Sequence, residues 1–204
     1  MSQLFSPLAI GPLSLPNRIV VAPMCQYSSI DGEASDWHVQ HWSNLALSGA
    51  GLVIVEATAV EPRGRISWAD LGLYDDATEA AFANALATVR RWSPAKMGVQ
   101  LAHAGRKAST LKPWEGGGGP IPADDARGWT TRAPSALPYA ETDPVPEALD
   151  DAGIAEIIQA FTDSAIRAVR LGLDLIEIHA AHGYLLHEFV SPLSNQRSDA
   201  YGGS

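Results

Sequence analysis

Four apolar segments, separated by amphipathic helical patterns, most narrowly limit what this 204-residue chain can fold into. They are Arg18–Met24, Gly51–Val60, Met97–Ala104 and Leu173–Ala181. Each is almost continuously apolar and rich in Val, Ile or Leu. That composition is typical of parallel strands covered by helices, and not of half-exposed antiparallel strands.

Helical patterns lie between these segments. Asp36 is expected to cap a helix that ends near Gly49, and a second helix is expected over about Ala77–Trp92. The clearest pattern is Asp151–Leu171, where apolar residues recur every three or four positions. The alternating order of strands and helices predicts right-handed crossovers and a parallel sheet, and therefore an α/β fold.

Two further segments stand outside this alternation. Gly105–Leu149 is rich in Pro and Gly and too long for an ordinary connection, so it predicts a functional loop or an excursion with its own hairpin. Within it, Gly116–Gly119 lacks the Lys-Ser/Thr of a phosphate-binding loop and is interpreted as a loop tip. The first 17 residues contain two short apolar pieces and predict a hairpin before the first strand.

Composition excludes several classes of function. The net charge of −9 argues against nucleic acid or an anionic membrane surface as a partner, because both require clustered basic residues. No apolar run reaches the roughly 18 residues of a membrane span. Cys25 is the single cysteine, and the N-terminus has no basic region followed by an apolar one. These features predict a single-domain cytoplasmic protein.

Polar residues gather where the four predicted strands end. In parallel α/β folds, working residues lie at the C-terminal ends of the strands. A buried polar group without a partner costs about 1–3 kcal/mol, so these ends point to a ligand with many hydrogen-bonding edges. The polar residues are Cys25, Gln26, Tyr27, Glu56, Thr58, Gln100, His103, Arg106, Lys107, His179, His182 and Tyr184.

The stretch IHAAHGY, residues 178–184, leaves three interpretations open. His179 and His182 can converge only if the chain turns between them, and Gly183 favours such a turn. Converging imidazoles can bind a metal, polarise one oxygen atom of a ligand, or serve as structural hydrogen-bonding groups. The metal interpretation needs a third ligand, and His187 and Glu188 do not form the His-Glu-x-x-His zinc motif.

Four stretches together resemble the Old Yellow Enzyme family of FMN-dependent ene-reductases. They are PNRIVVAPMCQY (16–27), GAGLVIVEATAV (49–60) followed by GRI (64–66), GVQLAHAGRKA (98–108), and LIEIHAAHGYLLHEFVSPLSNQRSDAYGGS (175–204). They occur in the family's order, with appropriate gaps. The similarity is greatest to the bacterial branch with a cysteine beside the flavin, which includes xenobiotic reductase-like enzymes.

The resemblance implies a (β/α)8 TIM barrel that holds FMN at the C-terminal ends of its strands. Pro23, Met24 and Cys25 match the segment that lines the flavin, and Cys25 would tune its redox potential. Ala57 matches a backbone contact to the ring, and Gln100 matches the side chain that hydrogen-bonds its pyrimidine edge.

The resemblance also implies a reaction. NADPH or NADH would reduce FMN, which would pass hydride to the β-carbon of an electron-poor alkene, such as an α,β-unsaturated carbonyl or nitro compound. His179 and His182 match the pair that holds the substrate's oxygen, and Tyr184 matches the proton donor. Tyr27 matches a tyrosine of the substrate pocket.

Two cations follow the third predicted strand. Arg106 and Lys107 would give electrostatic support to the reduced flavin or to the substrate entrance. Family members have a second barrel half, so residues 1–204 are expected to be the N-terminal half of a single FMN-binding domain, with the long excursion at about 105–149. A complementary C-terminal half is the expected partner, and the complete protein is expected to form homo-oligomers.

Two alternatives compete with the ene-reductase interpretation. One is a metal-dependent barrel hydrolase or isomerase with His179 and His182 as metal ligands. The other is a non-catalytic half-barrel that serves as an assembly fragment.

Overall fold

The computed structural model describes residues 2–203, and its elements alternate along the chain as the sequence predicts. The α-helices are α1 (Asp36–Ala46), α2 (Asp76–Trp92), α3 (Asp151–Arg170) and α4 (Leu185–Val190). The strands are β1 (Leu8–Ile10), β2 (Leu13–Leu15), β3 (Val20–Val21), β4 (Leu52–Ala59), β5 (Lys96–Ala102), β6 (Arg132–Ala133), β7 (Glu147–Ala148) and β8 (Leu175–Ile178). Short 3₁₀ turns are η1 (Gln3–Phe5), η2 (Pro62–Gly64) and η3 (Gly105–Lys107).

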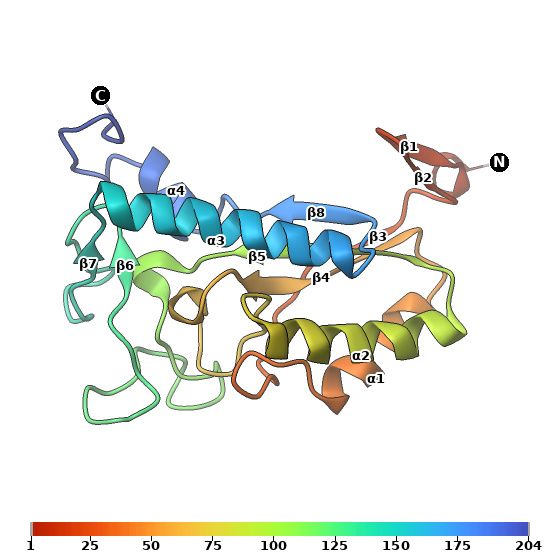
Figure 1. Ribbon diagram of the computed structural model, residues 1–204, viewed down its shortest axis with the longest axis horizontal. Coiled ribbons are helices and arrows are strands. Elements are labelled where there is room, and N and C mark those ends of the chain that lie inside the picture. The colour runs from red at the N-terminus through yellow and green to blue at the C-terminus, as the bar shows by residue number, and fades with distance from the viewer. Residues whose placement is uncertain (1, 204) are drawn as a thin grey trace.

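A parallel sheet in the order β3-β4-β5-β8 forms the centre of the molecule (Figure 1). All four strands point the same way, so their C-terminal ends lie at one end of the sheet. The sheet confirms the predicted parallel arrangement and has the strand order of consecutive βα units, as in part of a (β/α) barrel. All eight residues of β4 are buried, as its continuous apolar composition predicts.

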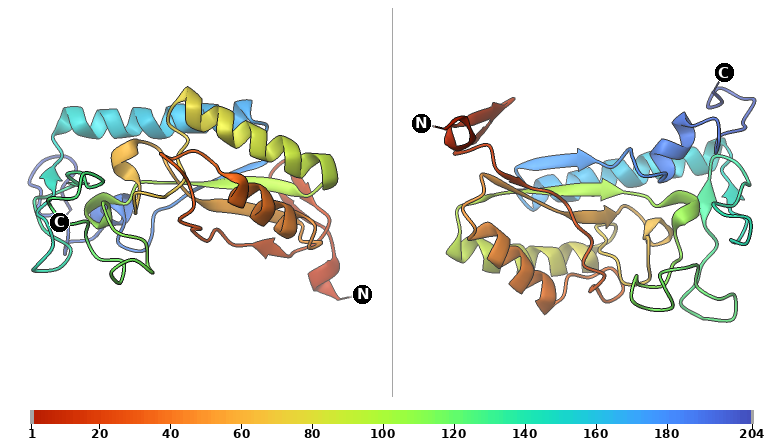
Figure 2. Two further views of the ribbon diagram at one scale, coloured as in Figure 1. Left: turned by 90° about the horizontal axis from the view of Figure 1, so that it is seen from below. Right: turned by 180° about the vertical axis from the view of Figure 1, so that it is seen from behind.

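The long helices bury one face of this sheet (Figure 2). Trp42 of α1 and Phe82 of α2 lie with ring centroids 4.9 Å apart, and α3 adds Ala168 to the same core. Val55 of β4 and Val99 of β5 complete the contact from the sheet. Each helix contributes an apolar stripe, which is why its i, i+3, i+4 pattern could be recognised in the sequence.

The N-cap residues define where the three long helices begin. Ser35, and not Asp36, is the N-cap of α1, because its side chain and that of His38 form a capping box. Asp75 caps α2 by accepting the Thr78 N–H at 2.8 Å. The helix α3 begins at Asp151 as predicted, with Asp150 accepting the Gly153 N–H at 2.8 Å.

The predicted N-terminal hairpin is present as β1 and β2, which pair antiparallel. It lies at the N-terminal end of the strands, opposite the long excursion (Figure 1). Leu15 of the hairpin is fully buried against Leu52, Ile54 and Leu175 on the sheet face that the helices do not cover. This face is therefore packed with hydrocarbon at one end of the strands.

All four central strands are shorter than predicted, and β3 and β8 are the shortest. β3 covers only Val20–Val21, because it is an outer strand with one neighbour and Pro23, which lacks an N–H, follows closely. β8 ends at Ile178, although the His179 N–H still donates to Leu101 O at 2.9 Å. The chain then leaves the sheet towards a turn in which His182 has a left-handed φ of +59°.

The long excursion is a loop, as one of the two predicted alternatives has it, and the alternative of a hairpin is wrong. Its strands β6 and β7 pair in parallel over two residues each, so the connection between them is a long loop and not a tight turn. The segment nevertheless lies where the central strands end (Figure 1). Among residues 2–203, no helix is both long and apolar enough to cross a membrane.

Candidate functional site

Two neighbouring strands bring polar groups to the sheet face opposite the long helices, beside Ala57 of a third strand. Gln100 of β5 lies in register with Ala57 of β4 on one side and Glu177 of β8 on the other. A β-bulge between Val55 and Ala57 sets this pairing, because the extra residue changes which face the following side chains occupy. The Gln100 Nε2 donates to Glu177 Oε1 at 2.5 Å.

His179, His182 and Tyr184 form one aromatic cluster. The ring centroids of His179 and His182 are 5.1 Å apart, and those of His179 and Tyr184 are 4.9 Å apart. The chain turns from His182 to Tyr184 through two left-handed residues, His182 with φ +59° and Gly183 with φ +72°. The structure thus brings the two imidazoles together, while Gly183 turns the chain between His182 and Tyr184.

His179 is neutral and presents an N–H donor. Burial lowers its pKa, and the neighbouring His182 and Lys107 lower it further against the opposing effect of Glu177. The Nδ1 of His179 accepts the Ala181 N–H at 3.2 Å. A neutral imidazole carries one hydrogen, so this contact places it on Nε2.

Two phenols near this cluster stay protonated at neutral pH. Burial raises the pKa of Tyr184 well above its ordinary value, and the negative charges that Cys25, Tyr27 and Asp70 can carry add to the effect. Burial also raises the pKa of Tyr27 to about 12, with a contribution from Cys25. Both side chains are therefore proton donors and not phenolates at physiological pH.

The segment after β3 reaches the same area. Pro23 is half-buried, whereas 57% of the Met24 surface is exposed. Burial raises the pKa of the Cys25 thiol, with the carboxylates of Asp70 and Glu56 acting in the same direction. Cys25 is therefore a neutral thiol and not a thiolate.

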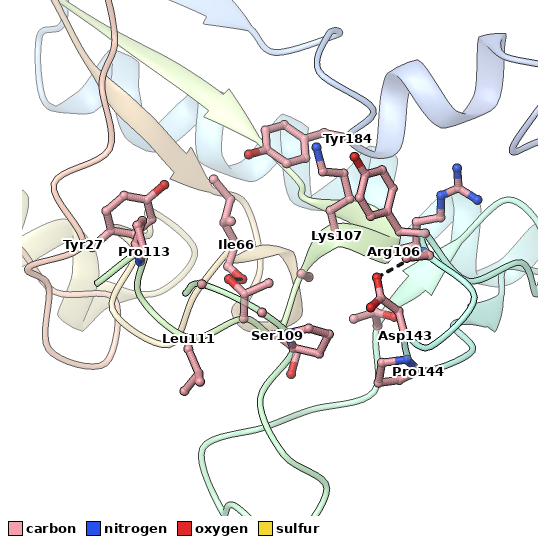
Figure 3. A pocket seen from close by; sticks show the side chains of 18 residues that line it. Tyr27, Ile66, Arg106, Lys107, Ser109, Leu111, Pro113, Asp143, Pro144 and Tyr184 are labelled. Carbon is pink, nitrogen blue, oxygen red and sulfur yellow. Dashed lines mark hydrogen bonds between the residues drawn. The ribbon is translucent and has the colours of Figure 1, made fainter. Parts of the chain in front are cut away.

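A cavity of about 370 Å³ opens beside the cluster (Figure 3). Tyr27 and Tyr184 lie on different parts of its wall, and Lys107 lies next to Tyr184. The predicted excursion supplies most of the remaining wall, which includes Leu111, Pro113, Gly118, Gly119, Tyr139, Asp143 and Pro144. Ile66 contributes from the segment after β4. A pocket of this size, mostly apolar with a few polar groups, suits a small organic molecule.

The two cations of the site make protein contacts. Arg106 donates through Nη1 to Pro138 O at 3.1 Å and to Leu137 O at 3.3 Å. Lys107 donates through Nζ to His182 O at 2.8 Å. Both cations thereby connect η3 to other segments of the site, and their support of a flavin stays a prediction.

Sequence reasoning missed three parts of the site. Glu177 contacts Gln100, and its place between Leu175 and His179 in a two-residue period could have identified it. Tyr139 lines the cavity from the excursion, where no periodicity exists. Glu188 is buried beneath η3 and accepts the Arg106 N–H at 2.9 Å. From the sequence it is considered only as a third metal ligand, and the zinc motif is absent.

Glu188 is a buried carboxyl group whose ionisation opposes folding. Burial raises its pKa to about 8 from an ordinary value of 4.5, against the opposing effects of the Arg106 N–H and of the Arg106 and Lys107 charges. Between these two pH values the folded state binds more protons than the unfolded state. Stability is therefore fully present below about pH 4.5 and is lost as pH rises through about 8.

We expect Glu188→Gln to flatten this dependence. Glutamine stays neutral and keeps an oxygen that can accept the Arg106 N–H. From pH 5 to pH 8, the variant's free energy of unfolding should fall by roughly 2–4 kcal/mol less than that of the parent, as measured by urea unfolding. Glu141→Gln, at an exposed loop position, is the matched control and should follow the parent. Equal slopes for parent and Glu188→Gln would contradict the assignment.

The metal-dependent alternative lacks structural support. Within residues 2–203, no three His, Cys, Asp or Glu side chains are grouped so that they could hold a metal ion. The nearest candidates are engaged otherwise: His187 Nδ1 accepts the Gly183 N–H at 2.9 Å, and Glu188 faces the backbone of η3.

Curated proteins of similar sequence are oxidoreductases. The chain is 46% identical over 206 residues to an NADH:flavin oxidoreductase of Gibberella zeae, covering 100% of this chain and 49% of that protein. It is also 46% identical over 203 residues to an NADPH dehydrogenase of Geobacillus thermodenitrificans, covering 98% of this chain and 54% of that protein. The chain thus spans about half the length of these relatives.

Solved structures with a similar fold include morphinone reductase, with a TM-score of 0.83, 31% identity, and coverage of 98% of this chain and 54% of that one. The Old Yellow Enzyme from Pichia sp. AKU4542 has a TM-score of 0.84, 28% identity, and coverage of 99% and 52%. These neighbours confirm the predicted barrel class, of which the parallel sheet is a part. Residues 3–204 match the NADH:flavin oxidoreductase / NADH oxidase family, and the chain belongs to that family.

Proposed function

We propose that this chain is part of an FMN-dependent oxidoreductase that uses NADPH or NADH to reduce the activated C=C bond of α,β-unsaturated carbonyl or nitro compounds. The observation that carries the proposal is the cluster of His179, His182 and Tyr184. The neutral imidazole of His179, with its hydrogen on Nε2, and the protonated phenol of Tyr184 have ring centroids 4.9 Å apart.

The residues present fit a flavin ring. Gln100 offers an amide, which can donate and accept, to the polar edge of a heterocycle. Ala57 next to it leaves room for a flat ring because it carries only a methyl group, and the neutral Cys25 thiol adds a soft, polarisable surface. When bound, FMN supplies the hydride chemistry of the reaction.

The imidazoles are suited to hold the oxygen of an electron-poor alkene. Negative charge develops on that oxygen as the β-carbon accepts hydride. A donor fixed in advance, such as the Nε2–H of His179, stabilises this charge more in the transition state than in the ground state. One such donor is typically worth about 2.7–4 kcal/mol.

Tyr184 is suited to protonate the α-carbon. Its raised pKa keeps the hydroxyl protonated at neutral pH, so the proton is available when the carbanionic carbon forms. Tyr27, also protonated, lines the same cavity and would contact the substrate.

Names of relatives favour a nicotinamide as the reductant. Several of the curated relatives are named NADPH dehydrogenase, and one structural neighbour, at 30% identity, is titled morphinone reductase in complex with tetrahydroNAD. We propose that the same reductant serves this chain. The proposal includes a complementary C-terminal barrel half, a homo-oligomeric assembly and a cytoplasmic location.

The test is turnover in the presence of flavin. The chain and its complementary C-terminal half are mixed with FMN, NADPH and 2-cyclohexen-1-one, and NADPH loss and cyclohexanone formation are followed together. We expect equal amounts of both, with FMN retained through gel filtration. Retained FMN without product would reject the substrate class. Neither flavin nor product would leave the non-catalytic assembly fragment as the interpretation.

We expect Gln100→Met to weaken FMN binding. Methionine has a similar volume but offers no amide, so one hydrogen-bonded ring contact is lost. Such a loss costs about 1–3 kcal/mol, which corresponds to a roughly 5- to 150-fold rise in the dissociation constant. Flavin fluorescence titration measures this. Gln159→Met, on the exposed face of α3, is the control, and an equal effect of both substitutions would contradict the role of Gln100.

A further inference from the structure

Lys107 contacts the turn that carries two of the three clustered side chains. Its Nζ donates to His182 O at 2.8 Å, although 75 positions separate the two residues. The neighbouring carbonyl, Ala181 O, already accepts the Tyr184 N–H at 3.1 Å. Within the turn, the His182 carbonyl therefore takes its hydrogen bond from a different part of the chain.

The backbone at this point is strained. His182 has a φ of +59°, a conformation that residues other than glycine rarely adopt. The next residue, Gly183, has a φ of +72°, and a Cβ there would lie 3.6 Å from Lys107 Cδ. The lysine stem thus packs along the turn, and its ammonium holds the strained residue's carbonyl.

The same ammonium lies between two tyrosine rings. Nζ is 5.0 Å from the ring centroid of Tyr184 and 4.8 Å from that of Tyr139. Both distances are within the range of an attractive contact between a cation and an aromatic face. Lys107 therefore touches His182 and Tyr184 at once, and joins them to the excursion through Tyr139 (Figure 3 shows Lys107 beside Tyr184).

Hydrogen bonds hold the backbone at Lys107 in place. The preceding Arg106 N–H donates to Glu188 Oε1 at 2.9 Å, and the Lys107 N–H donates to Ala104 O at 3.2 Å. Gly105 has a φ of +63°, and a Cβ there would lie 2.2 Å from Glu188 Oε1. Only glycine lets η3 sit this close to the buried Glu188 carboxyl.

We propose that Lys107 is a positioning residue that holds the His182–Gly183 turn through the His182 carbonyl and the Tyr184 ring, and so sets where both side chains lie relative to His179. This role differs from electrostatic support of a flavin, because the ammonium is engaged with the protein. The kinetic part of the test rests on the proposed function, whereas the spectroscopic part does not.

The test uses the protein with Lys107→Met, Lys107→Arg and the control Lys112→Met, and FMN is added for the kinetic part. Methionine keeps the stem but removes the ammonium, and arginine retains a cationic donor. Lys112 lies 4.1 Å from the Trp68 ring centroid and gives the same kind of contact elsewhere in the excursion. Ring resonances of His179, His182 and Tyr184 are followed by NMR from pH 5 to 9, and kcat and KM are measured in parallel.

With Lys107→Met we expect the His182 and Tyr184 resonances to move and kcat to fall about tenfold, the effect of losing one hydrogen bond to a charged group. The groups that face His179 are His182, Glu177, Lys107 and the Tyr184 ring. Removing the Lys107 charge should therefore raise the His179 pKa and move the acid limb of the pH–rate profile upwards. Lys107→Arg should keep kcat and the His179 pKa close to the parent's values, and Lys112→Met should match the parent.

Unmoved His182 and Tyr184 resonances in Lys107→Met would overturn the proposal, whether or not the rate falls. A fall in rate with unmoved resonances would show that Lys107 acts by its charge alone. A parent protein that does not reduce enones would reject the proposed function, while shifted resonances would still support the positioning role of Lys107.

Discussion

Replacing His179 and His182 together by asparagine should lower kcat for enone reduction roughly 10³-fold while FMN stays bound. Each imidazole would donate to the oxygen on which charge develops, and removal of one donor of this kind costs about 10²–10³ in kcat. The two losses will not simply multiply, because both donors would serve the same oxygen. Asparagine retains polarity but is too short to place an N–H where the Nε2–H of His179 lies.

The measurement separates binding from chemistry. FMN content is read from the absorption of the purified protein, and turnover is measured with 2-cyclohexen-1-one. His41→Asn is the matched control, because His41 lies on α1 and stacks on Trp37 with ring centroids 6.4 Å apart, away from the cluster. It should retain the parent's activity within about twofold. Normal turnover of the double variant would end the assignment of the pair.

Tyr184→Phe should slow only the half-reaction that consumes the alkene. A positioned general acid contributes about 10²–10⁴ in rate, and phenylalanine removes the proton but keeps the ring against His179. Flavin reduction by NADPH needs no proton from this phenol and should be unchanged. Stopped-flow absorbance of the flavin resolves the two half-reactions, and Tyr201→Phe, outside the cluster, is the control.

The pH dependence of the parent provides a second check on Tyr184. Burial raises its pKa above the ordinary tyrosine value of about 10, so the hydroxyl remains protonated across neutral pH. The alkene half-reaction should therefore show no alkaline loss from this group below about pH 10. Loss of rate between pH 7 and 9 that Tyr184→Phe abolishes would contradict the assigned protonation state.

Elements with a strong period were predictable from the sequence. The apolar stripe of α3 and the continuous burial of β4 appear where the pattern placed them. A turn near Gly183 was also foreseeable, and it lies between His182 and Tyr184. These features depend on residues close together in the chain, so local physics decides them.

Other features depend on contacts between distant residues. The contact of Lys107 with His182 O joins η3 to the turn after β8, and no sequence pattern near either residue predicts it. The excursion has no period, so its parallel β6 and β7 could not be told from a hairpin. The protonation of Glu188 follows from burial against Gly105, which only the folded chain reveals.

The hairpin β1–β2 also limits where the reactants of the proposed reaction would bind. Leu15 and its aliphatic neighbours fill the space at the start of the strands, so a polar ligand that contacts Gln100 would lie towards the loop end of this face. In the proposed reaction, NADPH and the alkene would bind at this same place, so one must leave before the other binds. Initial-rate plots at several concentrations of the second reactant would then be parallel lines, and each reactant in excess would block the other.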